Sequence, residues 1–167
     1  MVARALELIE ELRAEGQRTL VFSQFTTHLA LLREQLDARG ISYLELDGST
    51  PAAERRVRVK AFQEGNAQVF LISLKAGGFG LNLTAATNVV LLDPWWNPAV
   101  EDQAADRAHR LGQQQPVTIY RLVSMNTVEE LMLAMHARKR ALISEVLDGK
   151  SGASKVSTDE LIALLKR

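Results

Sequence analysis

The stretch with the strongest chemical content is residues 103–113, QAADRAHRLGQ. If this stretch is helical, Gln103, Arg107 and Arg110 lie at i, i+4 and i+7 and share one face. Two guanidinium groups that project from one face repel each other unless an anion lies between them. A polyphosphate is the expected anion, because a guanidinium donates two hydrogen bonds to phosphate oxygens and neutralises charge that develops in phosphoryl transfer. Spacing alone also allows a solvated helix face with neighbouring aspartates as counter-ions.

Further polar or glycine-rich segments follow each of four apolar, β-rich runs, where ligands collect in open parallel sheets. These segments are Ser23 to Phe25, Asp47 to Ser49, Lys75 to Asn82 (KAGGFGLN) and Asp93 to Asn97 (DPWWN). Glycines 77, 78 and 80 allow the backbone to approach a phosphate closely. The alternative is a tight turn before a helix, because the pattern matches neither GxGxxG nor the Walker A motif.

Two further features could contact nucleic acid. Trp95 and Trp96 are adjacent, so we expect at least one of them to meet solvent or a partner, where its ring could stack on a sugar or base; the alternative is that both pack on the following helix. Basic residues cluster at 55–60 and at 138–140. These clusters could bind phosphates or could be solvated helix faces.

Composition limits the function without choosing it. The chain has 167 residues and 47% apolar content, which suffices for one sizeable core. Its 20 basic and 20 acidic residues cancel, so any nucleic-acid surface must be local. There is no cysteine, and the three histidines lack ligand spacing, so we expect no metal site. No run reaches membrane-spanning length and no signal peptide is visible, which predicts a soluble, intracellular protein.

Strand and helix patterns alternate along most of the chain. Strands are expected at 19–25, 42–47, 69–73, 88–93 and 117–123, and helices at 3–15, 26–39, 51–63 and 98–111. Thr50 and Asn97 each precede proline and mark helix starts, whereas Gly40, Gly65 and Gly112 mark helix ends. This order predicts an α/β fold, a parallel β-sheet with helices on both faces.

After Val123 the alternation stops and a C-terminal helical extension follows. A long helix is expected over 126–147, opened by a capping box of Asn126 and Glu129 and carrying Leu131, Met135 and Leu142 on one side. A polar linker at 148–155 and a short helix after Ser157 complete the chain. We therefore divide it into residues 1–125 and 126–167.

Taken together, the motifs resemble a known family. VFSQF (21–25), LDGST (46–50), SLKAGGFGLNL (73–83), LLDPWWNP (91–98) and QAADRAHRLGQ occur in the order and spacing of the second RecA-like lobe of SWI/SNF-type DNA translocases, a branch of helicase superfamily two. The resemblance covers residues 20–123. The segment 130–149 also resembles the helix that braces this lobe against the first. Short loops and SLK, where eukaryotic relatives more often have TRA, suggest a bacterial or archaeal member that is cytoplasmic and nucleoid-associated.

The resemblance implies ATP as substrate, bound in a cleft between two lobes, with Mg²⁺ held by a first lobe outside this chain. Arg107 and Arg110 would be arginine fingers, Gln103 would couple to the γ-phosphate, and Gly80 and Asn82 would lie near the ribose. The same resemblance implies a track for double-stranded DNA made of Ser23, Gln24, Gly48, Ser49, Lys75, Gly77 and either Trp95 or Trp96. Implied partners are that DNA, the first lobe of the same polypeptide and a DNA-bound protein that is displaced.

The chain contains neither a Walker A motif nor an Asp-Glu-x-His box. We therefore expect it to be the C-terminal half of a larger ATPase, folded but inactive alone, in which a cleft-facing Arg107 contributes little to stability. Two alternatives stay open: the lobe of a strand-separating helicase, and a docking module for DNA or protein without chemistry.

Overall fold

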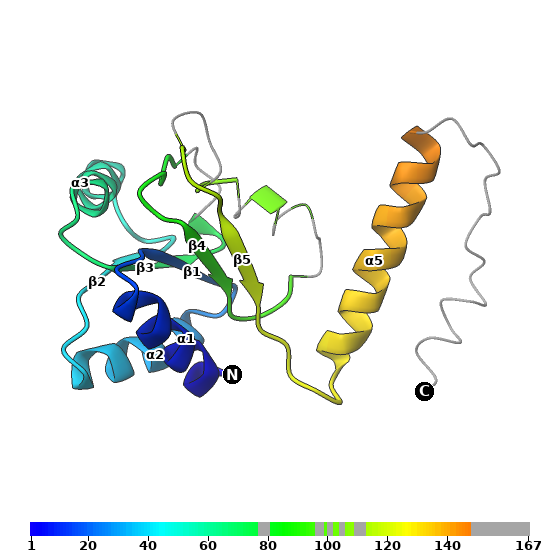
Figure 1. Cartoon of the computed structure of the whole chain (residues 1–167), viewed down its shortest axis with the longest axis horizontal. Helices are drawn as coiled ribbons and strands as arrows, with labels where there is room; N and C mark the ends of the chain where they lie inside the picture. Colours follow the sequence, from blue (N-terminus) through cyan, green and yellow to red (C-terminus); the bar gives the residue numbers. More distant parts are fainter. Residues whose placement is uncertain (77–80, 96–98, 100–101, 104–105, 109–112, 148–167) are drawn as a thin grey trace. The chain divides into compact units, whose positions relative to one another are not determined.

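A parallel sheet of five strands forms the centre of the fold, in the order β2-β3-β1-β4-β5. In the computed structural model these strands are β1 (Thr19–Ser23), β2 (Tyr43–Leu46), β3 (Val69–Ser73), β4 (Asn88–Leu91) and β5 (Thr118–Arg121) (Figure 1). The structure describes residues 1–76, 81–95, 99, 102–103, 106–108 and 113–147, and in the last helix the side chains up to Arg138 and that of Ala141. All five expected strands are present, and each lies within its predicted range.

Helices cover both faces of the sheet, which confirms the predicted RecA-like α/β architecture. α1 (Val2–Ala14) and α2 (Thr26–Ala38) pack on one face, through a core cluster that includes Ile9, Leu32 and the strand residue Val21. α3 (Ala52–Gln63) and the segment around Leu83 cover the other face, where Phe62 packs near Phe70. Alternate residues of each central strand enter opposite clusters, as a strand buried on both faces requires.

Glycine ends two of the helices, as predicted. Gly40 follows α2 with φ of 62°, and Gly65 follows α3 with φ of 90°, values that favour glycine. Arg18 donates hydrogen bonds to the carbonyl oxygens of Phe62 (3.1 Å) and Gln63 (3.3 Å) at the end of α3. A β-carbon at position 65 would lie 2.6 Å from the Arg18 guanidinium, which would have to shift, and the positive φ strains any larger residue there. Gly112 lies outside the described residues.

Two predicted helix starts are wrong in detail. Thr50 does not cap α3: Pro51 is the N-cap without a side-chain bond, because the Thr50 hydroxyl exchanges hydrogen bonds with Asp47. In the C-terminal helix α5 (Val128–Leu147), the cap is not the Asn126–Glu129 pair. Thr127 Oγ1 instead accepts from the Glu129 N–H (3.2 Å). Asn126 has φ of 59° and lies outside the helix.

The predicted helix at 98–111 is also wrong in part. Ala99, Asp102 and Gln103 are helical, and the Asp106 N–H donates to the Asp102 carbonyl oxygen (2.9 Å), but residues 106–108 form a turn. Whether Gln103 and Arg107 share one helical face stays a prediction, because residues 104–105 between them lie outside the described part of the chain. Asn97, Pro98 and Arg110 lie outside the described residues.

The chain divides between Val123 and Ser124 into two compact units. Among the described side chains of α5, Met132 and His136 are buried, whereas Leu131, which the sequence places on the apolar side of this helix, is 39% exposed. The side chain of Leu142 lies outside the described part of the helix. The linker at 148–155 and the helix after Ser157 lie outside the described residues.

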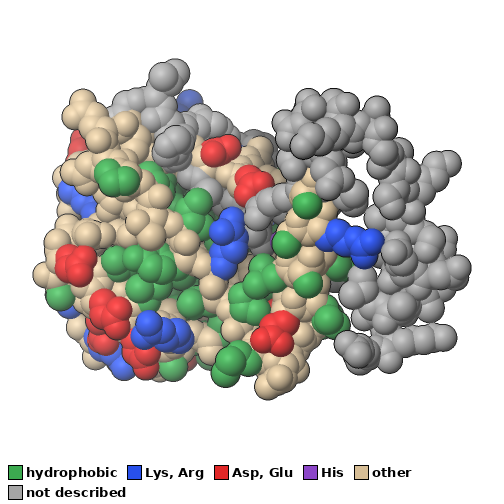
Figure 2. Space-filling view, turned by 45° about the vertical axis from the view of Figure 1, so that its right-hand side comes forward, with side chains coloured by type: hydrophobic (Ala, Val, Ile, Leu, Met, Phe, Trp, Pro, Cys, Tyr) green, Lys and Arg blue, Asp and Glu red, His purple; other side chains and the backbone are tan. Residues whose placement is uncertain are grey.

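On the face drawn in Figure 2, acidic and basic side chains are interspersed rather than separated by sign.

Candidate nucleotide and nucleic-acid site

Asp93 joins the loops that follow β1 and β4. Its carboxylate accepts a short hydrogen bond from the Ser23 hydroxyl and a second, of 3.0 Å, from the backbone N–H of Gln24. Gln24 Nε2 also donates to the carbonyl oxygen of Pro94 at 3.3 Å. Asp93 is 3% exposed and Ser23 is fully buried. Because charge-assisted hydrogen bonds are the strong ones, this contact fixes the loop after β1 firmly against the loop after β4.

His28 adds a third group to this contact. Its Nδ1 lies 3.5 Å from Asp93 Oδ1, a distance that forms an ion pair when the imidazole is protonated. The imidazole also meets the ring of Phe25 edge-on, with 5.1 Å between ring centroids. The first turn of α2 thus lies beside the same carboxylate as the loop before it.

A second carboxylate organises the loop that follows β2. Asp47 Oδ1 accepts from the backbone N–H groups of Ser49 (2.9 Å) and Thr50 (3.0 Å) and from both of their hydroxyls (2.7 and 3.0 Å). The hydrogen bond from the Ser49 hydroxyl is the largest cause that lowers the pKa of Asp47 below its ordinary value, assisted by the Thr50 donors and opposed by desolvation. Gly48 and Ser49 are left exposed at the tip of this turn.

Arg55 then fastens that turn to the loop after β3. Its Nε donates to the carbonyl oxygen of Thr50 (2.7 Å), and its two terminal nitrogens donate to the carbonyl oxygens of Asp47 (3.3 Å), Gly48 (3.3 Å) and Ala76 (3.4 Å). One guanidinium therefore spans two loops that are separate in sequence. Part of the predicted basic cluster at 55–60 is structural rather than free to bind phosphate.

The structure brings several predicted DNA-track residues to one edge of the sheet. Gly48, Ser49 and Lys75 are exposed there and Gln24 is half-buried, next to an exposed Phe25. Ser23 differs, because its buried hydroxyl bonds Asp93 and the backbone of Phe25, so it positions the loop instead of offering a side chain to DNA. Gly77 and Trp96 lie outside the described residues.

The predicted nucleotide residues are arranged differently from the expectation. Arg107 is 2% exposed and is among the largest buried side chains, which corrects the expectation of a cleft-facing guanidinium in the chain alone. Its carbonyl oxygen accepts from the Leu83 N–H at 3.0 Å, so the turn at 106–108 packs against the segment after β3. Gln103 and Asn82 are exposed. Gly80 and Arg110 lie outside the described residues.

Trp95 packs, half-buried, against the core cluster on the α3 side of the sheet. The expectation that at least one of the two tryptophans meets solvent or a partner stays a prediction, because Trp96 lies outside the described residues. Among the described residues, no group of three acidic, histidine or cysteine side chains could hold a metal ion.

No described helix is long and apolar enough to span a membrane.

Sequence reasoning did not find the positioning roles of Asp47, Arg55 and Asp93. The pattern Asp-Gly-Ser-Thr at 47–50 carried a usable signal, because aspartate bonds the backbone two residues on in Asx turns. The bond from Arg55 to Ala76 and the two donors to Asp93 carry no local signal, because these partners are distant in sequence.

Comparison with known proteins identifies the family. The model of the helicase conserved C-terminal domain matches residues 2–112. The chain belongs to this family. The helicase C-terminal domain described here is similar to the C-terminal part of the Fun30 ATPase domain, with a TM-score of 0.76 and 36% identity over 80% of this chain and 43% of that one.

Similar curated proteins are ATPases and repair proteins of the SWI/SNF type. The chain is 47% identical over 147 residues to the DNA repair protein RAD5A of Arabidopsis thaliana, covering 87% of this chain and 14% of that protein. It is 43% identical over 164 residues to the chromatin-remodeling ATPase INO80 of Cryptococcus neoformans, covering 98% of this chain and 9% of that protein. The helicase C-terminal domain thus spans a small part of these relatives, and both are eukaryotic.

Proposed function

We propose that this helicase C-terminal domain is the second motor lobe of an ATP-dependent translocase or remodeller that moves on double-stranded DNA. The observation that carries the proposal is the identity of 43 to 47% with a DNA repair protein and a chromatin-remodeling ATPase over most of this chain. We propose further that strand separation is not part of the activity, since the DPWWNP and RLGQ segments resemble the translocase branch.

The carboxyl edge of the sheet supports the DNA part of this proposal. Backbone N–H groups, hydroxyls and lysine are the usual donors to DNA phosphates, and such contacts carry no sequence information. The exposed cation of Lys75 is such a donor, on a loop that Arg55 ties to the exposed turn at Gly48 and Ser49. The Ser49 N–H and hydroxyl already donate to Asp47, so Ser49 would bind DNA only by exchanging those bonds. The lobe would therefore follow the DNA backbone without reading sequence.

ATP is the proposed substrate, and this chain would contribute the arginine fingers Arg107 and Arg110, with Gln103 beside the same phosphate and Gly80 and Asn82 near the ribose. Arg107 is buried in the chain alone, so the role requires that nucleotide binding brings its guanidinium into contact with the γ-phosphate. Arginine fingers contribute on the order of 10³ to 10⁵ in turnover in related reactions. Mg²⁺ would be held by the first lobe, since the described residues of this chain offer no acidic cluster for it.

The expectation of a bacterial or archaeal source receives no support from the relatives named above, which are eukaryotic. A cytoplasmic, nucleoid-associated location is proposed only for a bacterial or archaeal source, and a displaced DNA-bound protein stays a proposed partner.

The test is ATP hydrolysis by the full-length protein, with and without duplex DNA, alongside the 167-residue chain. We expect hydrolysis by the full-length protein that duplex DNA stimulates, none by the chain alone, and loss of the stimulated rate on Arg110→Ala. Displacement of a third strand from a triplex, without unwinding of a forked duplex, would distinguish the translocase from a helicase. Hydrolysis by the chain alone, or full-length protein that binds DNA without any hydrolysis, would refute the proposal.

A further inference from the structure

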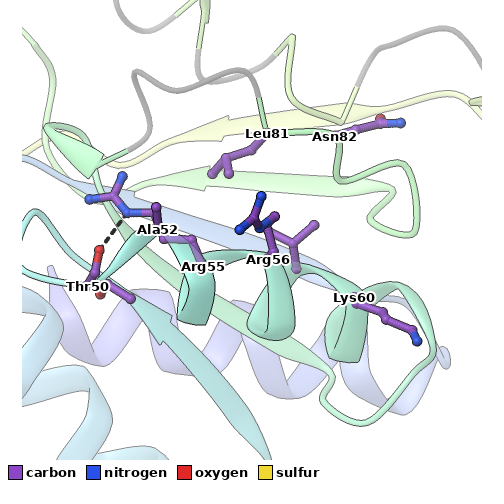
Figure 3. A pocket seen from close by; sticks show the side chains of 8 residues that line it. Thr50, Ala52, Arg55, Arg56, Lys60, Leu81 and Asn82 are labelled. Carbon is purple, nitrogen blue, oxygen red and sulfur yellow. Dashed lines mark hydrogen bonds between the residues drawn. The ribbon is translucent and has the colours of Figure 1, made fainter.

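A groove of about 620 Å³ lies between α3 and the segment that follows the loop after β3 (Figure 3). Its α3 wall consists of Ala52, Arg55, Arg56, Val59 and Lys60, positions spaced at i, i+3, i+4, i+7 and i+8 that form one helical face. Leu81 lies across from them. The volume accommodates several side chains of a bound segment.

The groove is positively charged. Arg55, Arg56 and Lys60 line it, and none of its described lining residues is acidic. Arg55 donates to the carbonyl oxygens of Thr50, Asp47, Gly48 and Ala76, which carry no formal charge.

The two other cations are available for a ligand. Arg56 is exposed and forms no hydrogen bond or ion pair with another described residue, and in Figure 3 its guanidinium points toward Leu81. Lys60 makes a 3.6 Å contact with Glu64, in which both side chains are more than half exposed. Because exposed pairs of this kind contribute little, an incoming anion can displace it.

An apolar strip separates these cations from the far wall of the groove, and Thr50 and Asn82 complete the lining. Ala52 and Val59 lie on the same side of α3 as the cations, and Leu81 faces them. A nucleic-acid backbone could pair with the cations, but its phosphates would find no donor on these three apolar side chains. An amphipathic helix matches both features, because its apolar side fills a hydrophobic groove at i, i+3, i+4 and i+7 while its charges meet the rim.

We propose that this groove binds an acidic amphipathic peptide segment of a partner protein. Apolar side chains of the segment enter between Val59 and Leu81, and its carboxylates pair with Arg56 and Lys60. The site is separate from ATP hydrolysis, although Asn82, which the proposed function places near the ribose, borders the groove.

The experiment uses a fluorescent helical peptide with leucines at i, i+3, i+4 and i+7 and glutamates on its other positions. Fluorescence anisotropy should show saturable binding to the 167-residue chain, and the methyl resonances of Val59 and Leu81 should shift in NMR spectra. Arg56→Glu and Lys60→Glu should each weaken binding by about tenfold or more, because each places like charges together. Both sites are exposed, so neither variant should unfold the protein.

Arg4→Glu is the matched control, since it makes the same charge change at an exposed site on α1 and should leave peptide binding unchanged. A peptide with lysines in place of the glutamates should not bind. The proposal fails if neither groove variant weakens binding, or if the methyl groups of Val59 and Leu81 do not shift. It also fails if Arg56→Glu weakens binding of duplex DNA or ATP but not of the peptide.

Discussion

Asp93 offers the sharpest test of how the site is held together. The carboxylate is 3% exposed and accepts hydrogen bonds from the Ser23 hydroxyl and the Gln24 N–H. In Asp93→Ala both bonds to a charged acceptor are lost, and each contributes roughly 1.5 to 3 kcal/mol. Part of this loss is recovered, because Ser23 can still donate to the carbonyl oxygen of Phe25 at 3.1 Å and because a buried charge is removed.

The balance predicts that Asp93→Ala lowers the free energy of unfolding by about 2 to 4 kcal/mol, a large share of the roughly 5 to 15 kcal/mol of a typical domain. Urea denaturation of the 167-residue chain measures it, and at an m-value of about 2 kcal/mol/M the midpoint should fall by about 1 to 2 M. Glu34→Gln, an exposed carboxylate on α2, is the matched control and should stay within about 0.5 kcal/mol.

A double-mutant cycle isolates the contact itself. Ser23→Ala alone should cost about 1 to 2 kcal/mol, and less in the Asp93→Ala background, with a coupling energy of about 1 to 2 kcal/mol. If Asp93→Ala is as stable as the wild type, or if the two substitutions are additive, the carboxylate does not fasten these loops and the reasoning is wrong.

Three further predictions concern single side chains. Arg107→Ala should lower the free energy of unfolding by about 2 to 4 kcal/mol in urea denaturation, because this side chain is buried, and an unchanged midpoint would contradict that burial. The pKa of Asp47 is lower in the folded than in the unfolded chain, so its contribution to stability is present above about pH 4 and is lost as the pH falls through the folded pKa. The difference in urea midpoint between wild type and Asp47→Asn should therefore be constant near pH 6 and shrink below about pH 4. A difference that does not change with pH would refute this role of Asp47. Lys75→Ala should weaken DNA binding in anisotropy titrations and reduce the salt slope by about 1, while Lys60→Ala should not, and equal effects would exclude a specific track.

The strands and most helix ends could be predicted from sequence because their causes are local. Apolar runs such as Val89 to Leu92 are typical of strands buried on both faces. Gly40 and Gly65 end their helices with a positive φ, a backbone conformation that other residues rarely adopt. The motifs also predicted the family that the comparisons show.

The helix caps could not be predicted as well, because several donors and acceptors compete for the same groups. Thr50 has the right residue type for an N-cap, yet the Asp47 carboxylate lies close enough to take its hydroxyl. Helical periodicity likewise predicted one helix over residues 98–111, yet residues 106–108 form a turn, because tertiary contacts such as the bond from the Leu83 N–H to the Arg107 carbonyl oxygen compete with the helical bonds.

The sequence by itself determined the parallel α/β sheet, the loops at its carboxyl edge and the family, since hydrophobic periodicity and turn residues act over a few positions. Only the tertiary structure decided which of those residues face outward. Ser23 and Asp93 are 70 positions apart and become partners because β1 and β4 are neighbours in the sheet. Arg55 joins two loops, and Arg107 is buried, for the same reason: burial and hydrogen bonding depend on contacts between distant segments, which no local pattern of residues encodes.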